Sequence, residues 1–170
     1  MTKKKTKTNA MRMLEAKGIP YVAHYYSPHV HSAQGVAERL GLPIGQVFKT
    51  LVVVTDKASA KGTALLAIVP GQRELDLKKL ARAAREKRLR MATQRQAESL
   101  TGLLVGGISP LALVNEGFGV FLDASAQEYS EILISAGRRG INLELAVADL
   151  VKVTGARLHP ISRPRDVFQR

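Results

Sequence analysis

The sequence has 170 residues, enough for one compact domain with a hydrophobic core and too few for a comfortable division into two. It contains no cysteine, which excludes disulfides, thiolate metal sites and cysteine nucleophiles, and no apolar run approaches the roughly 18 residues of a membrane span. The 26 Lys and Arg residues outnumber the 14 Asp and Glu residues and give a formal net charge of +12, which favours a polyanionic partner such as a nucleic acid. No export signal is recognisable, so we expect a cytoplasmic protein.

Short helices are predicted where apolar residues recur at helical spacing behind a capping residue. Asn9, Ser32 and Asp76 are the expected N-caps of the first three, and Thr93 with Gln96 forms a capping box for the fourth. The helices expected in this way cover residues 10–17, 33–40, 77–85, 94–100 and 146–153.

Runs of β-branched and aliphatic residues predict strands, of which 47–54 is the clearest. The other expected strands cover residues 21–26, 64–69, 103–105, 120–123, 131–136, 141–145 and 156–158. The sequence Gly137-Arg138-Arg139-Gly140 predicts a four-residue hairpin loop. Because crossover helices do not follow the strands regularly, we expect an α+β fold: a single compact domain with a strongly curved, mixed, largely antiparallel sheet flanked by short helices.

The chain ends differ in composition from the middle. Residues 1–8 are basic and almost without apolar side chains, which predicts a flexible tail. We expect the domain itself to cover residues 9–158, with a polar loop at 56–62 and a loose basic C-terminal tail at 159–170.

A glycine-rich segment, 101–110, is the first candidate site. Gly106 and Gly107 permit positive φ and close approach of another molecule, and Ser109 and Pro110 close the loop. Such a loop can point backbone N–H groups at one position and bind an anion or a carbonyl oxygen. Local chemistry alone leaves an ordinary turn between strands as the favoured alternative.

Basic residues supply two further candidates. Lys49 lies inside the strand 47–54, where a lysine is rare unless it is paired or functional, although it could also reach solvent from a sheet edge. A cluster of cations on helix 77–85 is a candidate tRNA or phosphate patch, although such charge runs are usually solvated faces. That cluster consists of Lys78, Lys79, Arg82 and Arg85.

Several kinds of chemistry have no support in the sequence. The four histidines, His24, His29, His31 and His159, form no His-Glu-x-x-His pattern and no convincing serine triad. Neither common phosphate-loop fingerprint is present. We therefore expect no metal and no cofactor.

Four motifs in order resemble the YbaK-type aminoacyl-tRNA deacylases, free-standing relatives of the editing domain inserted in bacterial prolyl-tRNA synthetases. The motifs are Phe48-Lys49-Thr50-Leu51-Val52, Leu75-Asp76-Leu77-Lys78-Lys79, Thr101-Gly102-x-Leu104-Val105-Gly106-Gly107-Ile108-Ser109-Pro110-Leu111 and Ser135-x-Gly137-x-Arg139-Gly140. The resemblance covers about residues 9–158 and implies a compact mixed domain around a strongly bent sheet.

The resemblance implies metal-independent hydrolysis of the ester of mischarged tRNA(Pro), particularly Cys-tRNA(Pro), with the substrate's own thiol attacking its carbonyl. The implied catalytic residues are Lys49, Gly106, Gly107, Ile108 and Ser109. Substrate binding is expected from Tyr26, Phe48, Thr50 and Ser135. Binding of tRNA is expected from Lys78, Lys79, Arg82, Arg85, Arg138 and Arg139. Lys49 is expected to anchor a phosphate or a sugar hydroxyl of the terminal adenosine rather than to act as the general base.

Two other functions stay open. A deacylase of the same fold could clear alanine or serine instead, because a one-atom difference in an apolar pocket discriminates only weakly. A non-catalytic tRNA-binding module is the alternative from another class. The expected partners are mischarged tRNA(Pro) and prolyl-tRNA synthetase, with neither membrane nor DNA.

Overall fold

The structure, a computed structural model, describes residues 6–30, 32–55 and 64–166. Its α-helices are α1 (Asn9–Ala16), α2 (Ala33–Leu40), α3 (Leu77–Ala84), α4 (Gln94–Thr101) and α5 (Val147–Thr154). The short 3₁₀ helices are η1 (Ile44–Gln46), η3 (Pro110–Ala112) and η4 (Ala124–Glu128). The strands are β1 (Val22–Tyr25), β2 (Phe48–Thr55), β3 (Ala64–Pro70), β4 (Arg73–Leu75), β5 (Leu89–Met91), β6 (Gly119–Asp123), β7 (Glu131–Ser135), β8 (Ile141–Ala146), β9 (Arg157–His159) and β10 (Ser162–Pro164). The predicted loop at 56–62 lies outside the described residues.

The strands form three sheets. A five-stranded sheet has the order β5-β2-β3-β6-β9, in which β2 pairs antiparallel with β5 and β3, and β6 pairs parallel with β3 and β9. An antiparallel sheet has the order β1-β8-β7, and β10 pairs with β4. A parallel bridge between Val47 and Leu133 connects the start of β2 to β7. The predicted α+β class and the β7–β8 hairpin are therefore confirmed.

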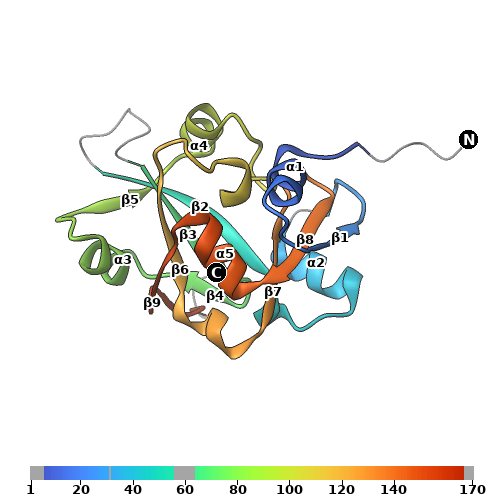
Figure 1. The fold of residues 1–170 in the computed structure, drawn as a ribbon. Coiled ribbons are helices and arrows are strands. Elements are labelled where there is room, and N and C mark those ends of the chain that lie inside the picture. The colour runs from blue at the N-terminus through green and yellow to red at the C-terminus, as the bar shows by residue number, and fades with distance from the viewer. Residues whose placement is uncertain (1–5, 31, 56–63, 167–170) are drawn as a thin grey trace, which may run out of the picture.

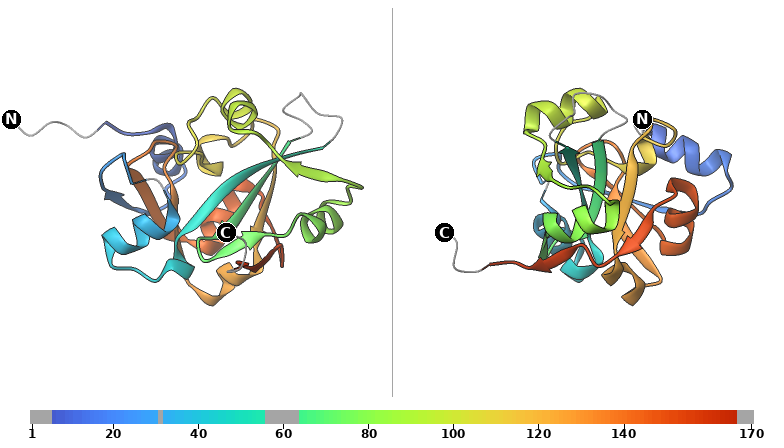
Figure 2. Two further views of the ribbon diagram at one scale, coloured as in Figure 1. Left: turned by 180° about the vertical axis from the view of Figure 1, so that it is seen from behind. Right: turned by 90° about the vertical axis from the view of Figure 1, so that its left-hand side faces the viewer.

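Both faces of the five-stranded sheet are buried, which explains why β3 is apolar throughout and β2 is apolar from Leu51 to Val54. Val52 and Leu66 face a core that includes residues of α1 and α5, whereas Val53 and Ala67 face a second core with α3. In Figure 1, α5 crosses in front of this sheet, α3 and β5 lie at one end of the molecule, and α1, β1 and α2 lie at the other. Figure 2 shows the same two ends from behind. The fold thus separates the basic helix α3 from the end that carries α2.

Local capping chemistry sets the helix ends much as the sequence predicts. The Asp76 side chain accepts hydrogen bonds from the N–H groups of Lys78 and Lys79, and the capping box of Thr93 and Gln96 is complete. Ser32 caps α2, which ends at Gly41 with a φ of 66°. These short-range hydrogen bonds satisfy donors that a helix leaves free in its first turn.

The first helix begins one residue earlier than predicted. Thr8, rather than Asn9, is its N-cap, and the Thr8 side chain accepts a hydrogen bond from the Met11 N–H. Lys7 pairs with Glu15 at 2.8 Å. The described end of the predicted basic tail therefore contacts α1.

The predicted strand at 103–105 is wrong. Helix α4 ends at Gly102, whose φ is 71°, and the next residues form turns without pairing to a strand. Leu104 is 57% exposed. A run of three apolar residues satisfies a strand pattern, but in the described part of the chain these residues pair with no strand.

The C-terminal segment is also more ordered than predicted. Strand β10 pairs with β4, and Ile161 is fully buried in the core beside α3. Asp123 is 3% exposed, and its Oδ1 accepts hydrogen bonds from the backbone N–H groups of Ile161 (2.9 Å) and Ser162 (3.0 Å). Thus residues 161–164 belong to the folded domain, and the boundary predicted at 158 is too early.

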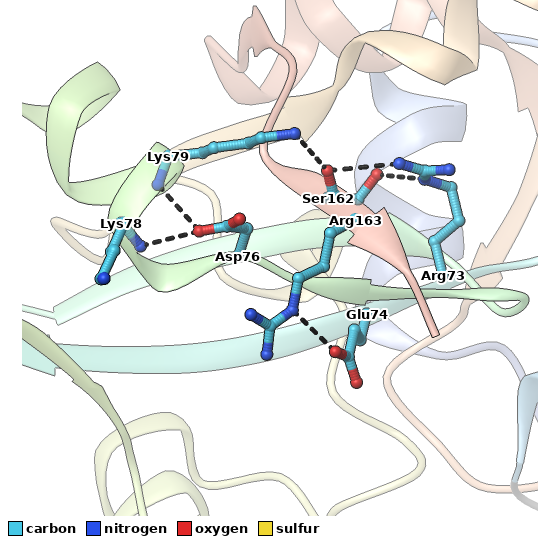
Figure 3. Close-up of polar contacts among 7 residues, drawn as sticks. All are labelled: Arg73, Glu74, Asp76, Lys78, Lys79, Ser162 and Arg163. Atoms are coloured by element: carbon cyan, nitrogen blue, oxygen red, sulfur yellow. Dashed lines mark hydrogen bonds and ion pairs between the residues drawn. The ribbon is translucent and has the colours of Figure 1, made fainter. Parts of the chain in front are cut away.

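Side chains from two elements hold the same segment. Figure 3 shows Arg73 and Lys79 reaching Ser162 from either side. Arg73 Nε donates to the Ser162 hydroxyl at 2.7 Å, and Lys79 Nζ donates to the Ser162 carbonyl at 3.0 Å. Arg163 pairs with Glu74 at 2.7 Å. Each of these contacts joins two residues that are more than 80 positions apart in the sequence, so local sequence patterns do not reveal them.

The buried carboxylate gives a test of this attachment. Asp123→Ala removes the acceptor for two buried N–H groups, and we expect a loss of on the order of 3 kcal/mol in the free energy of unfolding. Asp123→Asn keeps an oxygen acceptor, so its loss should be clearly smaller. Urea unfolding of the two variants measures the difference, and equal stabilities would contradict the role assigned to this oxygen.

Candidate active site

A cavity of about 320 Å³ opens where α2, the start of β2, the glycine loop, the β7–β8 hairpin and the C-terminal segment meet. This volume is at the lower end of the roughly 300–1,000 Å³ that is usual for small-ligand sites. Its lining residues are Tyr26, Ser32, Ala33, Gln34, Val36, Val47, Phe48, Lys49, Thr50, Leu51, Gly71, Val105, Gly106, Ile108, Ser135, Asn142 and Arg165. None of these lining residues is an Asp or Glu.

Most of the residues predicted for catalysis and substrate binding meet in this cavity. Those that line it are Tyr26, Phe48, Lys49, Thr50, Gly106, Ile108 and Ser135. Gly107 and Ser109 are not among the lining residues. Four segments distant in sequence therefore converge on one site, as a shared function would require.

The glycine loop is a turn with a defined shape. The Gly107 N–H donates to the Leu104 carbonyl at 2.8 Å, and Gly106, at the third position of this turn, has a φ of 90°. A positive φ at that position favours glycine. Because the Gly107 N–H is used inside the turn, Gly106 and Ile108 are the lining residues of this loop whose N–H groups remain candidates for binding a carbonyl oxygen.

Gly107 is needed for packing against the β7–β8 hairpin. A Cβ atom at Gly107 would lie 2.9 Å from the Arg139 nitrogen and 3.1 Å from the Arg138 carbonyl carbon. Arg139 Nε also donates to the Val105 carbonyl at 2.7 Å. The loop and the hairpin turn therefore hold each other in place, and Arg139 has a structural contact besides its predicted contact with tRNA.

Ser109 stabilises the exit of the loop. Its side chain is fully buried, and its Oγ accepts a hydrogen bond from the Leu111 N–H at 3.2 Å, which caps η3. This position supports the loop from behind the cavity and gives Ser109 no direct approach to a ligand there.

Lys49 brings a perturbed amine into the cavity. Burial lowers the pKa of Lys49 below its ordinary value, the positive charge of Arg165 lowers it further, and the negative charge of Glu74 opposes the change. At Lys49, β2 pairs with β3 on one side, whereas its pairing with β5 covers only Val53–Thr55. The bridge from Val47 to Leu133 lies two residues before Lys49, and within the described chain no strand pairing includes Lys49 on its second side.

A tyrosine and an asparagine form a polar pair at another part of the wall. Asn142 is 5% exposed, and its Nδ2 donates to the Tyr26 hydroxyl at 2.8 Å. Burial raises the pKa of Tyr26 to about 12, partly offset by this hydrogen bond, so the phenol stays neutral at physiological pH.

Within the described chain, the Thr50 hydroxyl oxygen is buried without a hydrogen-bond partner.

The sequence did not reveal Asn142 or Arg165 as site residues. Asn142 lies in a strand with no motif signal beyond the hairpin pattern, and Arg165 lies in the segment predicted as a loose tail. Arg165 Nη2 donates to the carbonyl of Gly71, another lining residue, at 2.9 Å. Only the long-range pairing of β10 with β4 brings Arg165 to the cavity.

The predicted basic face of α3 is a separate surface. Lys79, Arg82 and Arg85 line a hollow of about 650 Å³ together with Arg157 and His159. Lys78 and Arg82 line a second hollow beside Lys87 and Arg88. The contribution of β9 to this surface, through Arg157 and His159, was not predicted.

Comparisons with known proteins bear on this architecture. The family model described as the aminoacyl-tRNA editing domain matches residues 27–153. The chain is 41% identical, over 95% of its length and 98% of the relative's, to EbsC of Enterococcus faecalis, described as a Cys-tRNA(Pro)/Cys-tRNA(Cys) deacylase. The chain belongs to the aminoacyl-tRNA editing domain family.

The editing domain also occurs inside larger enzymes. The chain is 30% identical over 67% of its length to a proline–tRNA ligase of Sulfurihydrogenibium sp., and that match spans 19% of the ligase. A solved structure described as a trans-editing enzyme for prolyl-tRNA synthetase superposes with a TM-score of 0.77 at 27% identity, covering 91% of this chain and 95% of the other. The resemblance inferred from the four motifs is thus confirmed.

Two further findings concern the described parts of this editing domain. They contain no group of three or more His, Asp or Glu side chains that could hold a metal ion. None of their helices has both the length and the apolar character that a membrane crossing requires.

Gly107→Ala tests the contact between the loop and the hairpin. Its Cβ must displace the Arg138–Arg139 backbone, so we expect a loss of about 1–3 kcal/mol in stability and shifted amide resonances at both arginines. Gly102→Ala is the control, because it is strained by its φ of 71° but meets no atom within 4 Å. Unshifted hairpin resonances in Gly107→Ala would contradict the packing described.

The lowered pKa of Lys49 gives a pH test. Because the folded protein disfavours the charged amine, Lys49→Met should be more stable than the wild type at pH 7. That advantage should shrink as the pH rises through the lowered pKa and vanish above the ordinary value of 10.5. Thermal unfolding across this range, with NMR titration of ¹³C-dimethylated lysines, measures both effects. A Lys49 resonance that titrates at 10.5 or above would refute the assignment.

Proposed function

We propose that this protein is a deacylase of mischarged tRNA(Pro), with the cysteinyl ester as its preferred substrate. The observation that carries the proposal is the convergence of Lys49, Tyr26, Ser135 and the glycine loop on one cavity, in a chain 41% identical to a protein described as a Cys-tRNA(Pro)/Cys-tRNA(Cys) deacylase. The proposed setting is the cytoplasm, beside prolyl-tRNA synthetase.

The cavity supplies the requirements of ester cleavage without a nucleophile of its own. The cysteinyl thiol forms a C–S bond to the ester carbonyl carbon, the C–O bond to the ribose breaks, and the thiol proton passes to the leaving ribose oxygen. The products are the free tRNA and the β-thiolactone of cysteine, which water then opens to cysteine. Such intramolecular attack needs mainly a fixed geometry, and a well-oriented site can contribute about 7–11 kcal/mol. Backbone N–H groups of Gly106 and Ile108 stabilise the developing oxyanion.

The remaining polar residues bind the substrate in this proposal. Lys49 holds an anionic or hydroxyl group of the terminal adenosine, and the neutral hydroxyl of Tyr26, fixed by Asn142, donates a hydrogen bond to the aminoacyl group. The cations of α3, with Arg138 and Arg139, bind the tRNA backbone. Strand β10 links the two regions, because Ser162 contacts Lys79 on α3 and Arg165 contacts the cavity wall.

Hydrolysis assays test the function. Purified protein should release cysteine from Cys-tRNA(Pro) in the presence of EDTA, and Lys49→Ala should lower kcat/KM by about 10- to 100-fold, as expected for the loss of a charged hydrogen bond. Lys17→Ala, at an exposed lysine at the end of α1, is the matched control and should keep full activity. A tRNA carrying S-methylcysteine should resist cleavage, because its sulfur cannot attack.

The alternatives give different results. Preference for Ala-tRNA(Pro) or Ser-tRNA(Pro) would identify a deacylase with another amino-acid specificity. Cleavage of the S-methylcysteinyl ester would point to water as the nucleophile. Salt-sensitive binding of tRNA without turnover of any ester would leave a binding module.

A further inference from the structure

Arg165 joins Lys49 in the wall of the cavity. Its guanidinium is held there by the bond from Nη2 to the Gly71 carbonyl, which uses one of its five N–H donors. The main chain before it is fixed by the pairing of Pro164 with Arg73 in the β10–β4 ladder. The residue itself is exposed at the cavity's edge, where a ligand from solvent can reach it.

The charged residues that line the cavity are both cationic. Lys49 and Arg165 are its cationic lining residues, and no described lining residue is acidic. An aminoacyl-tRNA end carries a free amino group at one extremity and a phosphodiester at the other. The two cations repel the amino group and attract the phosphodiester, so they determine which end of the substrate lies beside them.

The other polar groups that line the cavity suit the aminoacyl group. They include the hydroxyl of Tyr26, the amide of Asn142, the hydroxyl of Ser135 and the backbone of Gly106. These groups are neutral. They can therefore accept a hydrogen bond from an amino group, or donate one to an ester carbonyl, without repelling a positive charge.

We infer that Arg165 is a substrate-binding residue that, with Lys49, binds the phosphodiester on the 5′ side of the terminal adenosine. This contact orients the ester toward Gly106 and Ser135. Arginine suits this task because its planar fork can donate two parallel hydrogen bonds to one phosphate group. The inference rests on the proposed function for the identity of the substrate, but the binding contact can be tested without turnover.

The experiment uses the full chain and two amide analogues that cannot transfer their acyl group readily. One is 3′-deoxy-3′-(cysteinylamino)adenosine, and the other is the same compound with a 5′-phosphate. Titration calorimetry should show that the wild type prefers the phosphorylated analogue. Arg165→Gln should reduce that preference by about tenfold, as for the loss of one charge-assisted hydrogen bond, while Arg165→Lys should retain part of it.

Arg163→Gln is the matched control. It removes one positive charge from the same segment, but Arg163 is exposed, pairs with Glu74 and does not line the cavity. Its preference for the phosphorylated analogue should equal that of the wild type. This comparison separates a contact with phosphate from a general effect of charge or of loosening β10.

The outcomes are distinct. Equal binding of the two analogues by the wild type, or an unchanged preference in Arg165→Gln, overturns the role of Arg165 even if Cys-tRNA(Pro) is hydrolysed. An Arg165-dependent preference supports it even if no ester is cleaved, in which case the proposed deacylase function fails alone. Equal losses in Arg165→Gln and Arg163→Gln would also overturn it.

Discussion

The buried carboxylate of Asp123 is the interaction on which the arrangement of the site depends. Its Oδ1 receives the N–H groups of Ile161 and Ser162, and so attaches the C-terminal segment to the end of β6. With Ile161 buried and β10 paired to β4, the chain is directed toward the cavity, where Arg165 meets Gly71. The Asp123 side chain thereby helps to fix β10, Ile161 and the part of the cavity wall that contains Arg165. Burying a polar acceptor costs desolvation free energy, which its hydrogen bonds offset.

Strand β2 shows a second constraint, in which stability and function oppose each other. Its apolar residues fill cores on both faces of the sheet, whereas Lys49, in the same strand, keeps an amine in surroundings that disfavour its charge. Arg165 adds a like charge nearby. Two cations held together without an acidic lining residue repel each other, and the phosphate of the proposed substrate contact would offset that repulsion.

The sequence predicted those features that depend on neighbours in the chain. Caps at Ser32 and Asp76, the capping box at Thr93 and the 137–140 hairpin loop follow from hydrogen bonds within a few residues. Most of the predicted site residues line the cavity, and they were predicted because whole motifs resemble a family. The strand at 103–105 was wrong because an apolar run does not show whether a pairing edge exists. Asn142 and Arg165 were missed because their contacts join segments about 90 to 120 residues apart.

The glycine loop shows why motif residues divide into two roles. Gly106 has the positive φ that shapes the turn, and it lines the cavity. Gly107 and Ser109 do not line the cavity. Gly107 packs against the Arg138–Arg139 backbone, and the Ser109 hydroxyl accepts a hydrogen bond from the Leu111 N–H. Their contribution is to hold Gly106 and Ile108 in position. Because an oxyanion donor is useful only within a few tenths of an ångström of its target, the packing behind the loop is as important to catalysis as the N–H groups themselves. The fold therefore divides a motif of adjacent residues into one layer that lines the cavity and one that packs behind it.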